Sequence, residues 1–380
     1  MNHTRHPKVH VPIELESLDF QGDVYGYYHP DSNEYHIVAW GETPPPAHHS
    51  YQSAELIGSI GFPVERQDGT LLCGVRTDKG LEFRAQNLVC YKETYNLLQN
   101  IFLRNTGILE TDWMLDKCAI ISGCGSVGSL IALELARSGV GNFVLVDNDT
   151  IAYHNLCRHQ CGVQDVGKFK THAVQERILQ VNPSAKVMIY NTILESVNKE
   201  IFDEFCKPGT LMLGCADNRE GDVYASTISC LYNVPFVSVG LWERACVGEI
   251  FYSIPSDNMP CYVCPFGRQT AAMSGRTSTN RRIYTTQEDL AKLHFEPGIS
   301  VDINFVTLIA LKLILDLFNR DNPNYTPRVI NHLSQFTLVC NTNDPRLGGE
   351  RAEIFAYPLQ VTTSLKVDYR SPCPPCKLRS

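Results

Sequence analysis

Between residues 117 and 254 the chain alternates short apolar runs with segments in which apolar residues recur three and four positions apart. Short apolar runs are typical of buried strands, whereas the longer spacing is typical of amphipathic helices. The expected elements are strand 118–122, helix 126–138, strand 142–146, helix 170–180, strand 186–190, strand 211–214, helix 219–231 and strand 236–239. This alternation predicts βαβ units, and therefore an α/β domain with a parallel, doubly wound sheet.

A different pattern precedes this region. The short β-rich stretches there are separated by turn-forming residues and lie at 24–28, 34–40, 70–75 and 81–84. We therefore predict a small β-rich domain over residues 1–90 and a second domain over residues 91–380. Residues 91–116 have helical spacing and are expected to pack onto the second domain, in which one strongly apolar helix is expected at 301–318.

The composition is that of a folded protein with room for about two domains, because the chain has 380 residues of which 43% are hydrophobic. No apolar run approaches the roughly 20 residues that span a bilayer, and residues 1–10 are polar, so we expect a cytoplasmic location. A net charge of −8 argues against a broad basic surface for nucleic acids. Fifteen cysteines, an odd number spread over the chain, indicate reduced thiols rather than a disulfide framework.

The sharpest local motif is Gly123-Cys-Gly-Ser-Val-Gly128, which follows a predicted strand and opens a predicted helix. Glycines at this spacing let the backbone turn tightly and approach phosphate groups at the positive end of the helix. The next strand ends in Asp147, whose carboxylate can accept hydrogen bonds from ribose hydroxyls. The motif predicts a nucleotide site, and the alternative is a tight structural turn without a nucleotide.

Residues beyond Asp147 favour a nucleoside triphosphate over a dinucleotide. Asn155, Arg158 and Lys170 supply amide, guanidinium and ammonium donors, which can neutralise phosphates and stabilise the charge of departing pyrophosphate. Asp217 follows another strand, where a carboxylate can hold Mg²⁺ beside those phosphates. The set favours nucleotidyl transfer over hydride transfer.

The motifs Gly-x-Gly-x-x-Gly, Asp-x-Asp, Asn-Leu-x-Arg, Gly-x-x-Lys and Ala-Asp-Asn occur in this order over roughly residues 95–380. Together they resemble the ubiquitin-activating (E1-like) superfamily, specifically its ThiF/MoeB/HesA-type adenylyltransferases. The resemblance implies a Rossmann-like adenylation domain that uses ATP and Mg²⁺ to activate the C-terminal carboxylate of a ubiquitin-like or sulfur-carrier protein as an acyl-adenylate. It implies catalytic roles for Arg158, Lys170 and Asp217. It also implies ATP contacts from Gly123, Gly125, Ser126, Gly128, Asp147, Asp149, Asn155, Arg158, Lys170 and Asp217.

The resemblance extends to partners and shows two departures. Family members usually form dimers, so a homodimer or a partner subunit is implied, together with a downstream enzyme that carries the thiol. His159 stands where many relatives have glutamine, as a harmless replacement or as an extra titrating group near the phosphates. The arginine that reaches the neighbouring subunit's ATP in relatives corresponds here to Gln99, with Arg104 the nearest arginine.

Two C-x-x-C pairs, Cys261 with Cys264 and Cys373 with Cys376, predict a metal site. Four thiolates in paired turns give the tetrahedral sulfur site that Zn²⁺ prefers, and such a site would clip the C-terminal region onto the domain. The alternatives are a redox dithiol and unmetallated thiols. His48 and His49 are a weaker metal signal in the N-terminal domain, more typical of an ordinary surface.

A thioester cysteine is not evident. Conjugating relatives transfer the adenylated carboxylate to a cysteine, but residues 265–339 contain none and offer Ser274, Ser278 and Thr279 instead. Candidates elsewhere are Cys157, Cys161 and Cys246, and a buried, inert cysteine is the alternative for each.

Several functions remain open from the sequence. The leading hypothesis is adenylation of a ubiquitin-like or sulfur-carrier protein, with the N-terminal domain recognising the carrier or a partner enzyme. The second is adenylation of a ribosomal peptide in natural-product biosynthesis, which also needs no loop cysteine. A nicotinamide-dependent oxidoreductase and an inactive scaffold subunit are the remaining alternatives.

Overall fold

The computed structural model describes residues 6–41, 54–62, 71–217, 219–266, 297–362, 367–369 and 372–379. Two compact units emerge, one formed by Met1–Arg104 with Asn182–Ser184 and the other by Asn105–Val181 with Ala185–Ser380. The expected boundary after residue 90 falls inside the first unit, because Tyr91–Tyr95 is a strand that pairs with Lys8–Pro12. The helix expected from residue 91 begins only at Leu97.

The N-terminal unit is built on an eight-stranded sheet of order β7-β6-β5-β4-β2-β3-β1-β8. Its strands are β1 Lys8–Pro12, β2 Gly22–His29, β3 Glu34–Trp40, β4 Glu55–Ile60, β5 Leu72–Thr77, β6 Gly80–Ala85, β7 Leu88–Val89 and β8 Tyr91–Tyr95. In β3 every second side chain is buried, with Tyr35 and Ile37 in the core and Glu34 and His36 on the other face. Strict alternation therefore gives this sheet one apolar and one polar face.

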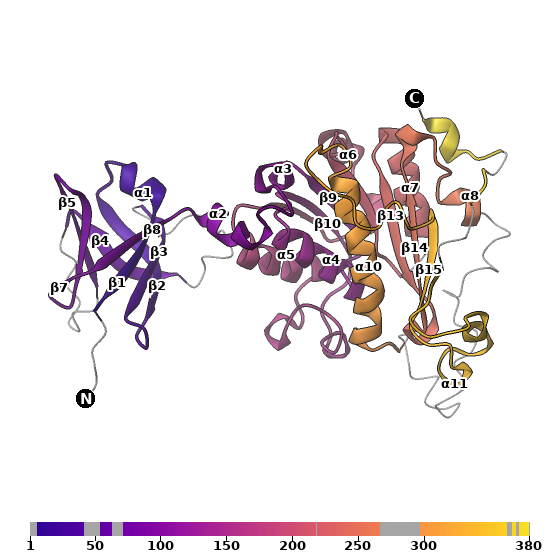
Figure 1. The fold of residues 1–380 in the computed structure, drawn as a ribbon, viewed down its shortest axis with the longest axis horizontal. Helices are drawn as coiled ribbons and strands as arrows, with labels where there is room; N and C mark the ends of the chain where they lie inside the picture. Colours follow the sequence, from indigo (N-terminus) through magenta and orange to yellow (C-terminus); the bar gives the residue numbers. More distant parts are fainter. Residues whose placement is uncertain are drawn as a thin grey trace. The chain divides into compact units, whose positions relative to one another are not determined.

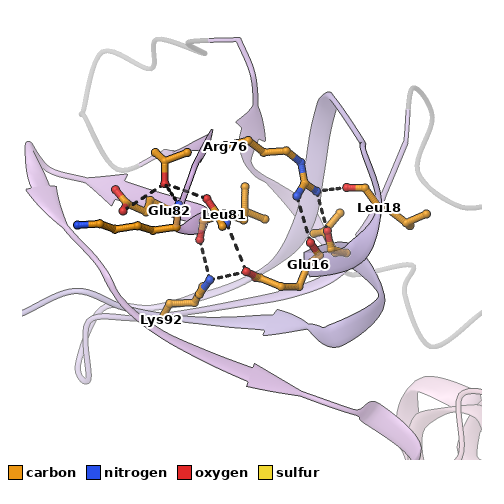
Figure 2. A network of polar contacts seen from close by, with 10 residues as sticks. Glu16, Leu18, Arg76, Leu81, Glu82 and Lys92 are labelled. Atoms are coloured by element: carbon orange, nitrogen blue, oxygen red, sulfur yellow. Dashed lines mark hydrogen bonds and ion pairs between the residues drawn. The ribbon is translucent and has the colours of Figure 1, made fainter.

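A short helix, α1 (Ile13–Ser17), is held to this sheet by polar contacts. Figure 2 shows Arg76 of β5 donating to backbone carbonyls at the end of α1, those of Leu15, Glu16 and Leu18. The Glu16 carboxylate accepts from Lys92 of β8 at 2.6 Å and from the Leu81 N–H at 3.3 Å. Because helix ends leave carbonyl groups without partners, Arg76 satisfies groups that α1 itself cannot. The unit continues into α2 (Leu97–Phe102).

The C-terminal unit contains a second eight-stranded sheet, of order β11-β10-β9-β12-β13-β14-β15-β16. Its strands are β9 Cys118–Ser122, β10 Asn142–Val146, β11 Lys186–Tyr190, β12 Thr210–Gly214, β13 Phe236–Leu241, β14 Val247–Ser253, β15 Phe336–Cys340 and β16 Val361–Thr362. The first five strands in this order, from β11 through β10, β9 and β12 to β13, pair in parallel, and β14, β15 and β16 follow in antiparallel pairing. The predicted α/β fold with a parallel, Rossmann-like core is confirmed.

Helices cover both faces of this sheet. The α-helices in the described part of the unit are α3 Thr111–Leu115, α4 Ser126–Arg137, α5 Lys170–Val181, α6 Lys199–Phe205, α7 Arg219–Tyr232, α8 Val263–Phe266, α10 Ser300–Phe318 and α11 Pro345–Gly348. Helices α4, α5 and α10 lie side by side on one face (Figure 1), and α6 and α7 pack on the other. In β9, Ala119 and Ile121 enter the first core and Cys118 and Ile120 the second. Among the described helices, none is both long and apolar enough to cross a membrane.

The chain order of the parallel strands creates a switch point. From β9 the chain moves outward to β10 and β11, then returns to β12 on the other side of β9. The connections after β9 and β12 therefore leave the sheet in opposite directions, which opens a crevice at the carboxyl ends of these strands. The glycine motif follows β9, and Asp217 follows β12.

Candidate functional site

The loop between β9 and α4 uses each of its three glycines differently. Gly123 has a φ of +93°, and a Cβ there would lie 2.7 Å from the Ala216 nitrogen. A Cβ at Gly128 would lie 1.8 Å from the Gly123 carbonyl oxygen, so only glycine lets α4 approach the loop. A Cβ at Gly125, by contrast, would meet nothing within 4 Å. The first and third glycines shape the turn, and the second leaves its backbone open to an incoming group.

Asp147, the residue after β10, holds this loop from one side. Its carboxylate accepts hydrogen bonds from the Cys124 N–H at 2.7 Å and from the Asp149 N–H at 2.8 Å. Burial raises the pKa of Asp147, although Lys170 and these two backbone donors act in the opposite direction. Each carboxylate oxygen retains a further lone pair, which is what a ribose hydroxyl would require.

His159 holds the same loop residue from the other side. Its Nε2 lies 2.7 Å from the Cys124 carbonyl oxygen, and its Nδ1 accepts from the Cys161 N–H at 3.2 Å. Because a carbonyl only accepts and an N–H only donates, this pairing requires the neutral imidazole with its proton on Nε2. Burial lowers the pKa of His159, which favours that neutral form. His159 therefore supports the loop, and its two nitrogens are engaged with the protein.

A cavity of about 580 Å³ lies at the switch point. Among the residues expected to contact ATP, those that line it are Gly123, Gly125, Ser126, Asp147, Asp149, Asn155, Arg158, Lys170 and Asp217. Gly128 does not line it, because this glycine is buried in α4 against the loop. The volume is typical of a small-molecule site, and the structure brings together residues that are 94 positions apart, Gly123 and Asp217.

Several side chains that line the cavity are held in place by neighbouring residues. Lys170 Nζ lies 2.7 Å from an Asp149 carboxylate oxygen, and the Lys170 N–H donates to the Asp149 carbonyl at 2.9 Å. Asn155 accepts from the Ala152 N–H at 2.8 Å, which fixes its amide. Asp217 is exposed and has no hydrogen bond or ion pair with another described residue. The cavity thus combines cationic donors for phosphate with an exposed carboxylate, that of Asp217, which can hold a metal ion.

A buried carboxylate beside the cavity, that of Glu249, was not predicted from the sequence. Glu249, 2% exposed, accepts from Arg219 Nη2 at 2.9 Å and from Trp242 Nε1 at 3.1 Å. Trp242 lines the cavity, and Arg219 opens α7 two residues after Asp217. A single carboxylate inside the apolar strand β14 was a usable signal, because a buried charge needs partners.

The turn that follows Trp242 is conformationally strained. Arg244 and Ala245 have φ values of 55° and 57°, which non-glycine residues rarely adopt. Ala245 and the preceding Glu243 line the cavity. Strained backbone of this kind persists where the surrounding structure holds it, often beside a binding site.

The four predicted metal cysteines meet in space, away from the cavity. Their Sγ atoms are 3.4 Å apart for Cys261 and Cys373, 3.6 Å for Cys264 with either Cys373 or Cys376, and 3.9 Å for Cys261 and Cys264. Four sulfurs at 2.3 Å from one tetrahedral Zn²⁺ are about 3.8 Å apart, so the cluster fits this ion. Cys230 of α7 packs against it and accepts from Arg379 at 3.6 Å.

The cysteines considered for a thioester differ in exposure. Cys157 is exposed and donates to the His154 carbonyl at 3.4 Å. Cys161 and Cys246 are buried, and burial raises their pKa values to about 12 and about 11. Buried thiols with raised pKa values are poor nucleophiles at neutral pH. The alternatives at Ser274, Ser278 and Thr279, and the pair His48 and His49, lie outside the described residues.

Comparison with known proteins gives a consistent result. The model of the ThiF family matches residues 98–346. Ubiquitin-like modifier-activating enzyme 5 of Dictyostelium discoideum is 26% identical over 250 residues, which cover 60% of this chain and 65% of that protein. The probable molybdopterin-synthase adenylyltransferase of Porphyra purpurea is 33% identical over 154 residues, 40% of this chain and 39% of that protein. The chain thus spans less than two thirds of the length of these relatives.

A solved structure shares the fold. The crystal structure of E. coli MccB with MccA-N7isoASN superposes with a TM-score of 0.50 at 17% sequence identity. The superposition covers 73% of this chain and 74% of that chain.

Proposed function

The chain belongs to the ThiF family, and we propose that it uses ATP to adenylate the C-terminal carboxylate of a ubiquitin-like or sulfur-carrier protein. The names of its relatives, a ubiquitin-like modifier-activating enzyme and a molybdopterin-synthase adenylyltransferase, support this class of reaction. The observation that carries the proposal is one cavity lined both by Gly125, beside which a Cβ would meet nothing, and by Arg158, Lys170 and Asp217.

The reaction requires little covalent chemistry from the protein. An oxygen of the substrate carboxylate attacks the α-phosphorus of ATP, the bond from that phosphorus to the β-bridging oxygen breaks, and pyrophosphate leaves. Arg158 and Lys170 donate to the phosphates and stabilise the charge that grows on the leaving group. Lys170 already stands against Asp149, so its ammonium group is positioned before the nucleotide arrives.

Asp147 and Asp217 have separate tasks in this proposal. Asp147 accepts hydrogen bonds from the ribose while it orders the loop through the Cys124 N–H. Asp217 would hold Mg²⁺ through its carboxylate, the kind of ligand this ion prefers, and the ion would neutralise charge on the phosphates. The exposed, unpaired position of this carboxylate among the described residues suits a ligand that enters together with ATP.

The cysteine cluster has a structural role in this proposal. Cys261, Cys264, Cys373 and Cys376 would hold Zn²⁺ in a closed shell of four sulfurs, which leaves no position for a substrate. The ion would tie the C-terminal segment η10 (Pro375–Leu378), which packs against α7, to Cys261 and Cys264 at the start of α8.

Partners follow from the chemistry. Because Cys161 and Cys246 are poor thiolates, we propose that thioester formation, where it occurs, takes place on a separate thiol-carrying enzyme. We further propose that the chain acts as a homodimer and that the N-terminal unit recognises the carrier or the partner enzyme.

Adenylation of a ribosomal peptide is the second candidate. The same cavity can present ATP to any flexible carboxylate tail. The raised pKa values of the buried thiols Cys161 and Cys246 favour a product that leaves as the acyl-adenylate or reacts with another donor. The two candidates share the cavity chemistry and differ only in the substrate.

ATP–pyrophosphate exchange tests both. The purified chain is mixed in turn with ubiquitin-like proteins and short peptides encoded beside its gene, each also supplied with a blocked C-terminal amide. We expect exchange with one candidate and none with its amide. Exchange with a peptide alone would select the second candidate, and no exchange with any free carboxylate would contradict adenylation by this chain alone.

A further inference from the structure

Three side chains with metal-binding atoms lie together on the polar face of the N-terminal sheet. They are His10 on β1 and Glu34 and His36 on β3, strands that are neighbours in the sheet (Figure 1). His10 stands directly opposite His36 in the parallel pairing of these strands. Val9, Tyr35 and Ile37 fill the core on the other face, so alternation alone places the three polar side chains on the same side.

The distances suit a shared ion better than direct hydrogen bonds. One Glu34 oxygen, Oε2, lies 3.7 Å from His10 Nε2 and 3.7 Å from His36 Nε2. Hydrogen bonds in proteins are usually shorter than about 3.2 Å, whereas nitrogen and oxygen ligands of one tetrahedral Zn²⁺ lie about 3.4 Å apart. The three ligand atoms all lie within 4.8 Å of one another.

His10 adds a second, independent observation. Its Nε2 is buried from solvent and has no hydrogen-bond partner among the described residues. Buried polar atoms in folded proteins are normally satisfied, and such an atom without a partner calls for an explanation such as an ion. Lys8, on the same strand as His10, forms its ion pair with Glu93 and not with Glu34.

From these contacts we propose that His10, Glu34 and His36 form a divalent metal site on the N-terminal unit, separate from the cysteine cluster. Two imidazoles and one carboxylate are ligands for Zn²⁺ and similar transition ions rather than for Mg²⁺ or Ca²⁺. The rings of His10 and His36 are stacked at 4.2 Å with 7° between their planes. One ring must turn out of this stack on binding, because an imidazole holds its metal in the ring plane.

His29 on β2 is the neighbour that can complete the site. It stands opposite Glu34 in the antiparallel pairing of β2 with β3, and its ring meets His36 edge-on at 5.4 Å. With His29 the ion would join three adjacent strands, and without it a water molecule would occupy the fourth position.

Equilibrium dialysis of the untagged full chain against low-micromolar free Zn²⁺ at neutral pH tests the proposal. We expect the wild type to retain one ion more than His36→Gln or Glu34→Gln, with the affinity of either variant lowered by roughly 100-fold or more. His6→Gln removes an exposed histidine of the same unit and should retain the extra ion. Loss of the ion in His6→Gln alone, or no difference between the wild type and both ligand variants, would overturn the site.

Cobalt spectroscopy separates this ion from the cysteine-bound one. Co²⁺ is added to chain that carries a single Zn²⁺, on its cysteines, and whose N-terminal site is empty; it should give weak visible bands without the near-ultraviolet sulfur charge-transfer band. Sulfur bands from the second ion would place it at cysteines and contradict the proposal. Circular dichroism in metal-free buffer checks that the variants fold. Both substituted side chains are half-buried on the polar face. Two independent variants keep the test valid if one of them does not fold.

Discussion

At the scale of single residues, the site depends on contacts that fix one peptide of the glycine loop. Asp147 accepts from the Cys124 N–H and His159 donates to the Cys124 carbonyl, so both polar groups of this residue are held by buried side chains. The Cys124 thiol itself is buried, and burial raises its pKa well above the usual range, which makes it a packing residue. Chemistry therefore falls to the residues around the cavity and not to the loop cysteine.

His159→Leu should weaken ATP binding more than His159→Gln. Glutamine can both donate to the Cys124 carbonyl and accept from the Cys161 N–H, whereas leucine leaves both backbone groups buried without partners, at a cost of about 1–3 kcal/mol each. The KM for ATP in pyrophosphate exchange and the free energy of unfolding measure the two effects. Equal behaviour of the two variants would remove His159 from the support of the loop.

His159 also predicts a pH dependence of stability. Burial lowers the pKa of His159 in the folded chain, whereas in the unfolded chain it has the ordinary histidine pKa of about 6.5. As the pH falls below that value, the unfolded chain therefore binds a proton at His159 more readily than the folded chain does. The contribution of this residue to stability is therefore full above about pH 6.5 and is lost as the pH falls through the native pKa. Unfolding in urea between neutral and acidic pH should show this loss in the wild type and a smaller one in His159→Gln.

Asp217→Ala should abolish pyrophosphate exchange and leave stability within about 0.5 kcal/mol, because this carboxylate is exposed and unpaired among the described residues. Glu200→Ala is the matched control, since Glu200 is also an exposed acid and lies on α6, outside the residues that line the cavity. Exchange is measured for both with the same substrate. Normal exchange by Asp217→Ala would exclude Asp217 from the active site.

At the scale of elements, the loop and α4 act as one unit whose glycines are not interchangeable. A Cβ at Gly128 would lie 1.8 Å from the Gly123 carbonyl oxygen, so glycine is what lets the start of α4 lie against the end of β9. Gly125, Ser126 and Val127 at the start of this helix line the cavity, and a helix N-terminus favours a phosphate. Glu249 holds the start of α7 in a similar way, because its carboxylate accepts a hydrogen bond from Arg219, the first residue of that helix.

Gly125→Ala and Gly128→Ala should separate binding from folding. The added methyl at Gly125 meets no protein atom within 4 Å, and φ there is −74°, so stability should change by less than about 1 kcal/mol while ATP affinity falls. The methyl at Gly128 would overlap the Gly123 carbonyl at 1.8 Å, so this variant should lose roughly 1–3 kcal/mol or more of stability. Thermal melting and ATP titration distinguish them; unchanged ATP binding in Gly125→Ala would show that phosphate does not approach this backbone.

At the scale of the whole molecule, the four-cysteine cluster brings distant parts of the chain together, where we propose that Zn²⁺ binds. Cys261 and Cys373 are 112 positions apart, and their sulfurs lie at 3.4 Å. Closing so long a loop with an ion that binds only the folded state contributes stability through the unfolded chain as well as through the contact. The N-terminal unit, with its own sheet and core, is a separate structure in the same chain.

Cys264→Ser should release the cysteine-bound zinc and lower the stability of the C-terminal unit by several kcal/mol. Cys73→Ser is the control, because Cys73 lies in β5 of the N-terminal unit, outside the cluster. Zinc content by atomic absorption and melting temperature are measured for both. Zinc retained at wild-type level by Cys264→Ser would contradict the four-sulfur site.

Much of this protein is determined locally. Apolar alternation sets the βαβ order, and the glycine motif with Asp147, Asn155, Arg158 and Lys170 predicts residues that do line one cavity, because parallel strands deliver their carboxyl ends to the same edge. The C-x-x-C spacing likewise predicts cysteines that meet in space. In each case neighbouring residues carry the signal.

Only the tertiary structure decides the features that depend on pairing between distant segments. Residues 91–95 have helical spacing but form β8, since the open edge of β1 offers hydrogen bonds that outweigh local preference. The register of strands and the course of loops decide three further features. These are the hydrogen-bond partners of His159, the burial of Glu249 against Arg219 and Trp242, and the contact of His10 with His36. The sequence determines which residues can form strands, helices and ligands, and long-range packing determines which of them come together, because contact energy depends on three-dimensional distance and not on position in the chain.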